Sequence, residues 1–234
     1  MKDPRLVLFD IDGTLLRTDG VGTVCIVQAL EEVFKISIDT EGYQTSRKTD
    51  TQICLELMRQ AGRSDDEVLN SLDAMRLLYL PLLAKEIAEA GIEVFPGVRE
   101  LLDRLSGCEN ILVGLLTGNI ERGARMKVEA TGLGDYFSFR AYGDTAVERK
   151  ELPQRAVNKA LVETGRTYGG KEIVILGDTP NDVECGRSLG VTSIAVATGS
   201  YTREELSKHD PDHLFEDFGD TEAVLSAILG EGQL

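Results

Sequence analysis

The sequence is short of long hydrophobic runs, paired cysteines and positive charge, and each shortage excludes a class of protein. No run approaches the ~18 apolar residues that a membrane-spanning helix needs. The N-terminal stretch MKDPRLVLFD enters a strand that carries acids, whereas a signal peptide has an apolar core there. We therefore expect a cytoplasmic protein with no membrane partner.

Basic residues are outnumbered: 25 Lys and Arg face 40 Asp and Glu, which gives a net charge of −15. Such a balance argues against a nucleic-acid partner or an anionic membrane surface. An anionic substrate must then be attracted locally, by a metal ion or by a few basic side chains. The two histidines, His209 and His213, lie in an acidic tail outside every motif, and we assign them no role.

Cysteine and proline are also scarce. The four cysteines lack the spacing of a zinc site or of a disulfide scaffold, which predicts buried free thiols: Cys25, Cys54, Cys108 and Cys185. With only 6 Pro and 42% hydrophobic residues, the 234-residue chain is long enough to bury a substantial core. It could form one large domain or two unequal ones.

Apolar runs alternate with helical patterns along most of the chain. Strands are expected at residues 6–8, 111–116, 173–176 and 193–196, an extended segment at 137–142, and helices at 98–105, 120–130 and 152–163. Strands separated by helices of this length predict a parallel sheet with helices on both faces. The expected fold class is therefore α/β, with a Rossmann-like doubly wound sheet.

Residues 18–90 do not follow this alternation of strands and helices, because they carry helical patterns but no strong apolar strand. Helix-compatible spacings run through residues 24–34, 51–60 and 69–90. We expect an all-helical cap domain at 18–90, inserted into a core domain made of residues 1–17 and 91–234. Joined to the core at two points, such an insertion could close over a substrate as a lid.

Polar clusters follow three of the expected strands. Asp10 and Asp12 end the first strand, where alternation sends both carboxylates to one side and Ile11 to the other. The other clusters are Thr117-Gly118-Asn119 and Asp178 with Asp182. Ligands gather at the carboxyl ends of parallel strands, so the clusters should converge in space. Taken alone, the Asp10 motif is either a polar turn or a metal or acid/base site.

These motifs resemble those of the haloacid dehalogenase superfamily, in its phosphoglycolate-phosphatase-like branch with a helical cap. The first motif of that family, Asp-x-Asp-Gly-Thr, is matched by residues 10–14, the second by Leu115 to Asn119, and the fourth, Gly-Asp-x-x-x-Asp, by Gly177 to Asp182. The resemblance covers nearly the whole chain. It implies a phosphatase that acts on a small phosphorylated metabolite.

The resemblance also implies roles for the acids. Asp10 would attack phosphorus and form an aspartyl-phosphate, while Asp12 would protonate the leaving alcohol and then activate water. Magnesium would be the metal, held by Asp10, by the backbone carbonyl of Asp12 and by Asp178, with Asp182 acting through water or orienting the other ligands. Thr117 and the backbone of Gly118 and Asn119 would hold the phosphoryl oxygens.

The third motif departs from the family pattern. Relatives carry Lys-Pro-x-Pro before a helix, whereas residues 148–153 read Glu-Arg-Lys-Glu-Leu-Pro. Lys150 keeps the spacing to Pro153, and Arg149 competes because a guanidinium can span two oxygens. We place Lys150 ahead of Arg149 as the cation beside the nucleophile.

Substrate choice should depend on the cap loop around residues 45–50. Thr49 is a candidate substrate-binding residue, and Arg47 or Lys48 could bind an anionic leaving group; the alternative is a solvated loop with an Asp cap. Ser46-Arg47 also resembles the cap of beta-phosphoglucomutases, which keeps phosphoryl transfer as a second reading. Hydrolysis of 2-haloacids is disfavoured, because Asp12 supplies a proton that a halide leaving group does not need.

Overall fold

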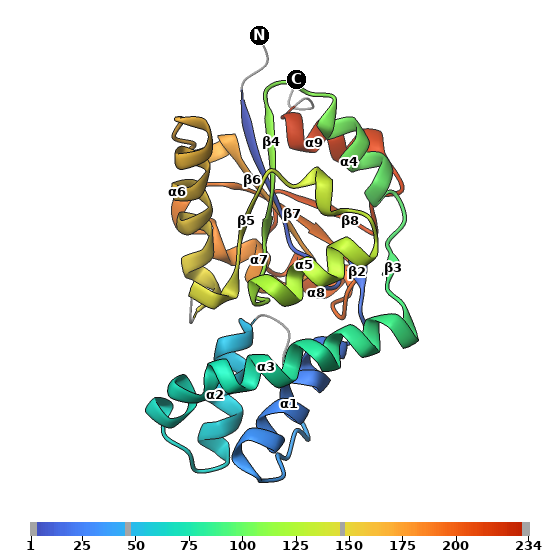
Figure 1. Cartoon of the computed structure of the whole chain (residues 1–234). Coiled ribbons are helices and arrows are strands. Elements are labelled where there is room, and N and C mark those ends of the chain that lie inside the picture. Colours follow the sequence, from blue (N-terminus) through green and yellow to red (C-terminus); the bar gives the residue numbers. More distant parts are fainter. Residues whose placement is uncertain (1–3, 45–47, 146–147, 231–234) are drawn as a thin grey trace.

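The core of the protein is a six-stranded parallel sheet (Figure 1). In a computed structural model, residues 4–44, 48–145 and 148–230 are described. The strands run in the spatial order β5 (Phe139–Ala141), β4 (Ile111–Leu116), β1 (Arg5–Phe9), β6 (Ile173–Gly177), β7 (Thr192–Val196) and β8 (His213–Phe215). Every neighbouring pair is parallel. The α/β fold expected from the sequence is confirmed.

Helices cover both faces because the strands are apolar on both sides. Along β1, Val7 and Phe9 enter one core cluster, and Leu6 and Leu8 enter another. The first cluster packs under α4 (Val98–Ser106), α5 (Glu121–Ala130) and α9 (Thr221–Leu229), and the second under α6 (Leu152–Thr164) and α7 (Pro180–Cys185). The short helix α8 (Arg203–Ser207) packs beside α7 through the buried Leu206.

Three helices form the cap between two short paired strands, β2 (Leu16–Arg17) and β3 (Glu93–Val94). They are α1 (Val21–Phe34), α2 (Asp50–Gln60) and α3 (Asp65–Ala90), and they share an apolar core of their own. Ser64 starts α3 with a reciprocal capping box to Glu67. Figure 1 shows the cap at the carboxyl end of the parallel strands. The boundary of the cap domain at residues 18–90 stays a prediction.

Several short elements went unpredicted. The sequence did not signal β8 or α9, and five single-turn 3-10 helices connect the larger elements: η1 (Gly134–Tyr136), η2 (Gly143–Thr145), η3 (Arg149–Glu151), η4 (Gly170–Glu172) and η5 (Arg187–Leu189). His213 lies in β8, at the edge of the sheet. All four cysteines are free as expected, and three are buried, with Cys108 half-buried.

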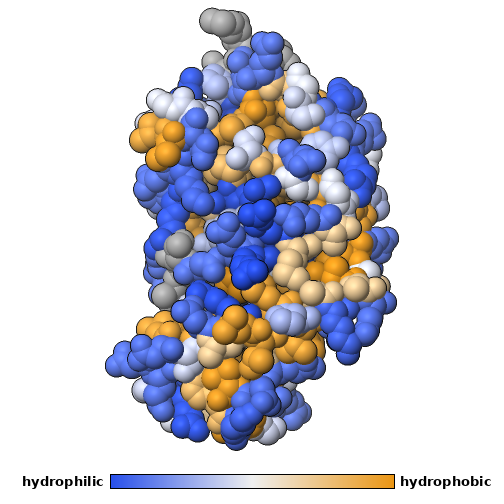
Figure 2. All heavy atoms as spheres, viewed as in Figure 1, coloured by the Kyte–Doolittle hydropathy of each residue, from blue (hydrophilic) through white to orange (hydrophobic). Residues whose placement is uncertain are grey.

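The surface of the cap includes exposed apolar side chains. Figure 2 shows hydrophobic surface gathered over the cap on the face in view. Within α3, Leu69, Leu77 and Leu78 are exposed. Among the described residues, no helix is both long and apolar enough to cross a bilayer.

Candidate active site

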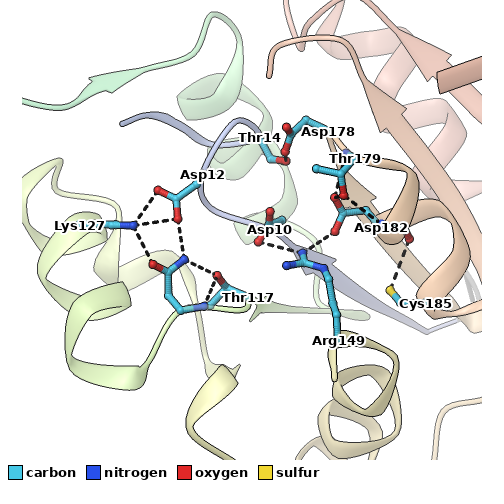
Figure 3. Close-up of polar contacts among 11 residues, drawn as sticks. Asp10, Asp12, Thr14, Thr117, Lys127, Arg149, Asp178, Thr179, Asp182 and Cys185 are labelled. Atoms are coloured by element: carbon cyan, nitrogen blue, oxygen red, sulfur yellow. Dashed lines mark hydrogen bonds and ion pairs between the residues drawn. The ribbon is translucent and has the colours of Figure 1, made fainter. Parts of the chain in front are cut away.

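The polar clusters at the ends of β1, β4 and β6 line one cavity of about 630 Å³ between the sheet and the cap. Asp10 and Asp12 lie on this cavity together with Asn119 and Asp178, whereas Ile11 is fully buried in the core. The alternation expected along the end of β1 is therefore present. Figure 3 shows how Asp10, Asp12 and Asp178 lie relative to one another.

The cation beside Asp10 is Arg149, from η3. Its Nη2 lies 3.0 Å from Asp10 Oδ1 and also contacts Asp182 Oδ1, and its side chain is only 6% exposed. Burial raises the pKa of Asp10 to about 6, although the charge of Arg149 opposes this rise. The two acids in turn hold the pKa of Arg149 well above its usual value, despite burial.

The structure corrects the ranking of the two basic residues in the third motif. The Lys150 side chain is 76% exposed and pairs with Glu148, away from the nucleophile. Residues 149–151 form a turn of 3-10 helix that leads into α6, so successive side chains point in different directions. The spacing to Pro153, on which the sequence argument rested, does not decide which of the two side chains faces the sheet.

Asp10, Asp178 and Asp182 form a group that could hold a divalent cation. One oxygen from each carboxylate lies within 4.8 Å of the others. Burial, followed by the charges of Asp182 and Asp10, raises the pKa of Asp178 well above its usual value. Arg149 is the one cation paired with this group among the described residues, so three ionised acids would leave two negative charges. Hard oxygen ligands with that residual charge fit Mg²⁺.

Local backbone geometry holds the fourth-motif acids in place. Thr14 Oγ1 donates to Asp178 Oδ1 at 2.9 Å, and a Cβ on either Gly13 or Gly199 would overlap the Asp178 carboxylate. Asp182 Oδ2 accepts from the backbone N–H of Thr179 at 3.0 Å and from its hydroxyl at 2.6 Å. Asp182 Oδ1 also contacts Arg149, so both oxygens of Asp182 have partners within the protein.

Asp12 contacts a lysine that the sequence analysis missed. Lys127 Nζ, from α5, lies 2.8 Å from both oxygens of Asp12, and its side chain is 2% exposed. Burial alone would raise the pKa of Asp12, but the charge and hydrogen bond of Lys127, together with the hydrogen bonds of Thr18 and Asn119, hold that pKa below its usual value. Asp12 is therefore a carboxylate in the free protein.

A weak signal for Lys127 was present in the sequence. It lies on the same helical face as Ala124 and Val128, both of which are buried. A charged residue on the apolar face of an amphipathic helix is unusual and needs a partner. Its partner, Asp12, is 115 residues away, which no local pattern reveals.

The second motif is organised by side-chain hydrogen bonds. Asn119 Nδ2 donates to Thr117 Oγ1 at 2.8 Å and to Asp12 Oδ2 at 2.6 Å, and the N–H of Asn119 lies 3.3 Å from the Thr117 hydroxyl. The Gly118 carbonyl accepts from the backbone N–H of Asp50, in the cap, at 2.8 Å. Thr117 is fully buried, whereas Gly118 and Asn119 line the cavity.

Two carboxylates occupy the N-terminus of α5. Asp50 Oδ2 accepts from the N–H of Ile120 at 2.8 Å, and Asp144 accepts from the N–H of Glu121. A free helix N-terminus attracts anions, but these N–H groups already have partners. Phosphate contacts from this motif would therefore come from the residues before the helix. Asp50 also ties the cap to the core at this point.

The residues predicted to bind substrate from the cap lie in different surroundings. Arg47, with Ser46, lies outside the described residues. Thr49 is fully buried and starts α2 by accepting from the N–H of Gln52 at 3.1 Å, so the helix cap is a buried threonine and not an aspartate in a solvated loop. Lys48 lines the cavity and pairs with Glu56 at 2.5 Å.

The buried Asp50 carboxylate predicts a measurable pH effect on stability. Burial raises its pKa from 3.8 to about 6, with Lys127 opposing and Asp12 and Asp144 adding to the rise. The folded state then binds a proton that the unfolded state releases, so Asp50 costs stability as the pH rises from about 4 to 6. Since one pKa unit is worth about 1.4 kcal/mol, the cost is about 3 kcal/mol above pH 6.

Asp50→Asn should remove this cost and keep an acceptor for the N–H of Ile120. Its stability relative to wild type, measured by urea denaturation, should rise between pH 4 and pH 6 and then level off. A difference that stays flat over that range would show that Asp50 titrates as an exposed carboxylate does.

Comparison with known proteins gives a consistent result. The sequence profile of the family described as "Haloacid dehalogenase-like hydrolase" matches residues 7–196. The chain is 28% identical to a phosphoglycolate phosphatase of Rhodospirillum rubrum, over 92% of this chain and 88% of the relative. It is 26% identical to a phosphoglycolate phosphatase of Synechococcus elongatus, over 96% and 99%. A solved structure of a predicted phosphoglycolate phosphatase from Haemophilus somnus has the same fold, with a TM-score of 0.70 at 20% identity, over 96% and 99%.

Proposed function

The chain belongs to the haloacid dehalogenase-like hydrolases, and on this premise we propose that it is a magnesium-dependent phosphatase that hydrolyses small phosphate monoesters through an aspartyl-phosphate on Asp10. One observation carries the proposal. Asp10 lies on the cavity beside Arg149, within a group of three buried acids that could hold a metal. A nucleophilic carboxylate next to a cation suits attack on an anionic phosphoryl group.

In the first step, a carboxylate oxygen of Asp10 bonds to phosphorus while the bond from phosphorus to the leaving oxygen breaks. Asp12 gives a proton to that oxygen. Because Asp12 is ionised in the free protein, we expect it to take up this proton when the dianionic substrate binds beside it. Arg149 neutralises negative charge on Asp10 and on the transferring group.

In the second step, Asp12 accepts a proton from water, the water oxygen bonds to phosphorus, and the bond to Asp10 breaks. Phosphate leaves, and Asp12 releases to solvent the proton that it took from water, so that both carboxylates return to the ionised state of the free protein. Thr117, Gly118 and Asn119 lie next to this centre and would hold phosphoryl oxygens. Asp10, Asp178 and the backbone carbonyl of Asp12 would hold the metal, which supplies further neutralisation of phosphoryl charge when it is bound.

The leaving group occupies the cap side of the cavity, where Tyr43, Lys48 and Ile53 are exposed to it. These residues differ in character, so a range of small phosphorylated metabolites could fit. The names of the curated relatives make 2-phosphoglycolate the first compound to try. The cytoplasmic location inferred from the N-terminus stays a prediction.

A substrate panel tests the proposal. Phosphate release should be measured with 2-phosphoglycolate, glycerol phosphate, a hexose phosphate and p-nitrophenyl phosphate, each with Mg²⁺ and with a chelator. We expect turnover of at least one compound in Mg²⁺ and its loss on chelation. Release of halide from a 2-haloacid without any phosphate release would contradict the proposal. Interconversion of hexose phosphate isomers without net hydrolysis would favour the mutase reading.

A further inference from the structure

Lys127 is the most completely buried lysine that contacts the site, and its ammonium group has three acceptors. They are both oxygens of Asp12, at 2.8 Å each, and Asn119 Oδ1, at 2.7 Å. The Lys127 side chain is 2% exposed, whereas the Asp12 side chain is 32% exposed toward the cavity. A lysine is seldom buried this deeply unless its charge is paired and its donors are used.

These contacts restrict the Asp12 carboxylate from two sides. Its Oδ1 accepts from Thr18 Oγ1 at 2.6 Å as well as from Lys127, and its Oδ2 accepts from Asn119 Nδ2 at 2.6 Å as well as from Lys127. Each oxygen therefore has two donors, which fixes both the position and the plane of the group. Figure 3 shows Lys127 facing both oxygens of Asp12.

Lys127 also determines the orientation of Asn119. The Asn119 oxygen faces the ammonium group, so its amide nitrogen must face Asp12 and the Thr117 hydroxyl. Turning the amide over would place an NH₂ group against the ammonium and leave Asp12 without that donor. The second motif is in this way linked to the first through one lysine.

The helix that carries Lys127 is itself anchored against the cap. Asp50 holds its N-terminus, and the buried Tyr79 of α3 packs on Gly123, where a Cβ would lie 2.8 Å from the tyrosine oxygen. Gly22, in the first turn of α1, leaves room for the ammonium, since a Cβ there would lie 3.2 Å from Lys127 Nζ. Lys127 is thus placed by packed helices and not by a loop.

We propose that Lys127 is a positioning residue for Asp12, holding its carboxylate on the cavity wall in the orientation that proton transfer to and from the substrate requires. The proposal rests on the proposed role of Asp12. It assigns no contact between Lys127 and the substrate, so the effect of the lysine must pass through Asp12. Proton transfer depends steeply on such geometry, and a misplacement of about 1 Å can cost about 100-fold in rate.

A double-mutant cycle tests this dependence. Lys127→Met, Asp12→Asn and the double variant should be compared by kcat and KM in Mg²⁺, using glycerol phosphate and p-nitrophenyl phosphate. We expect Lys127→Met to lower kcat for glycerol phosphate by about 10- to 100-fold, with little change in KM. In the Asp12→Asn background, the same change should cost less than about 3-fold, because the group it positions is already gone.

The leaving group provides a second signature. An alkoxide needs the proton from Asp12 more than a nitrophenolate does, so both single variants should lose more activity on glycerol phosphate than on p-nitrophenyl phosphate. Lys127→Arg should recover part of the loss, since it keeps the charge. Arg125→Met, on the exposed side of the same helix, is the matched control and should behave as wild type.

Three results would overturn the proposal. The first is that Lys127→Met lowers kcat by the same factor whether residue 12 is Asp or Asn. The second is that Lys127→Met lowers kcat equally for both substrates, although Asp12→Asn lowers it more for glycerol phosphate. The third is that Lys127→Met keeps activity within about 2-fold of wild type. Should Lys127→Met not fold, the cycle can be run with Lys127→Arg.

Two further observations separate this proposal from the proposed function. A wild-type protein without phosphatase activity would refute the proposed function. A crystal structure of Lys127→Met in which the Asp12 carboxylate has not moved would contradict the positioning role, whatever the activity of the wild type.

Discussion

Asp10→Asn should lower kcat by about 10⁴-fold or more while leaving the fold intact. An amide nitrogen or oxygen is a far weaker nucleophile than a carboxylate, and the proposed aspartyl-phosphate cannot form without the latter. The change is nearly isosteric, and Arg149 keeps its contact with Asp182. Circular dichroism and thermal unfolding should therefore resemble those of wild type.

The covalent step can be observed separately from turnover. Acid quenching with a ³²P-labelled substrate should trap label on wild-type protein and none on Asp10→Asn. Asp135→Asn is the control for the substitution itself, because Asp135 is an exposed aspartate that does not line the cavity. Near-normal turnover by Asp10→Asn, with its sequence verified by mass spectrometry, would rule out the covalent mechanism.

Arg149→Met should cause the second largest loss, about 10²- to 10⁴-fold in kcat/KM. The substitution removes the cation that contacts both Asp10 and Asp182, in a site where charge is poorly screened. It also leaves buried carboxylates unpaired, which typically costs about 3–5 kcal/mol of stability. Activity should therefore be measured in Mg²⁺ at a temperature where circular dichroism confirms a folded protein.

Lys150→Met is the matched control, because it removes the same charge from the neighbouring residue. Lys150 is exposed and pairs with Glu148, so we expect activity within about 2-fold of wild type. Arg149→Lys should recover part of the activity lost in Arg149→Met, since an ammonium can reach one acid but does not span two as a guanidinium does. The reverse order, with Lys150→Met inactive and Arg149→Met active, would restore the ranking drawn from sequence spacing.

The fold could be predicted from the sequence because the patterns that indicate its strands and helices lie within short runs of neighbouring residues. Residues 111–116 and 173–176 are apolar runs that could only be buried strands or short helices, and their length decided between the two. In the structure the resulting strands, β4 and β6, flank β1. By contrast, β8 is three half-buried residues paired on one edge only, so its composition carries little pattern.

Part of the site could be predicted from the sequence, because the carboxyl ends of parallel strands lie at the same edge of the sheet. Asp10, Asp178 and Asp182 were expected to meet on that ground, and the structure brings them together. Arg149 and Lys150 could not be separated by such reasoning, because adjacent residues differ only in the direction of their side chains. Lys127 was missed because its partner lies on another element, over a hundred residues away.

The sequence by itself determined the parallel sheet, the inserted helices and the acids that follow its strands. Each of these depends on hydrophobic periodicity or on the order of elements along the chain, which can be read from neighbouring residues. Only the tertiary structure decided which basic side chains pair with those acids. Arg149 and Lys127 are buried against Asp10 and Asp12 by the packing of η3 and α5, while Lys150 is left in solvent. A charge enters a protein interior only where a distant partner offsets the loss of water, and that pairing exists only once the chain has folded.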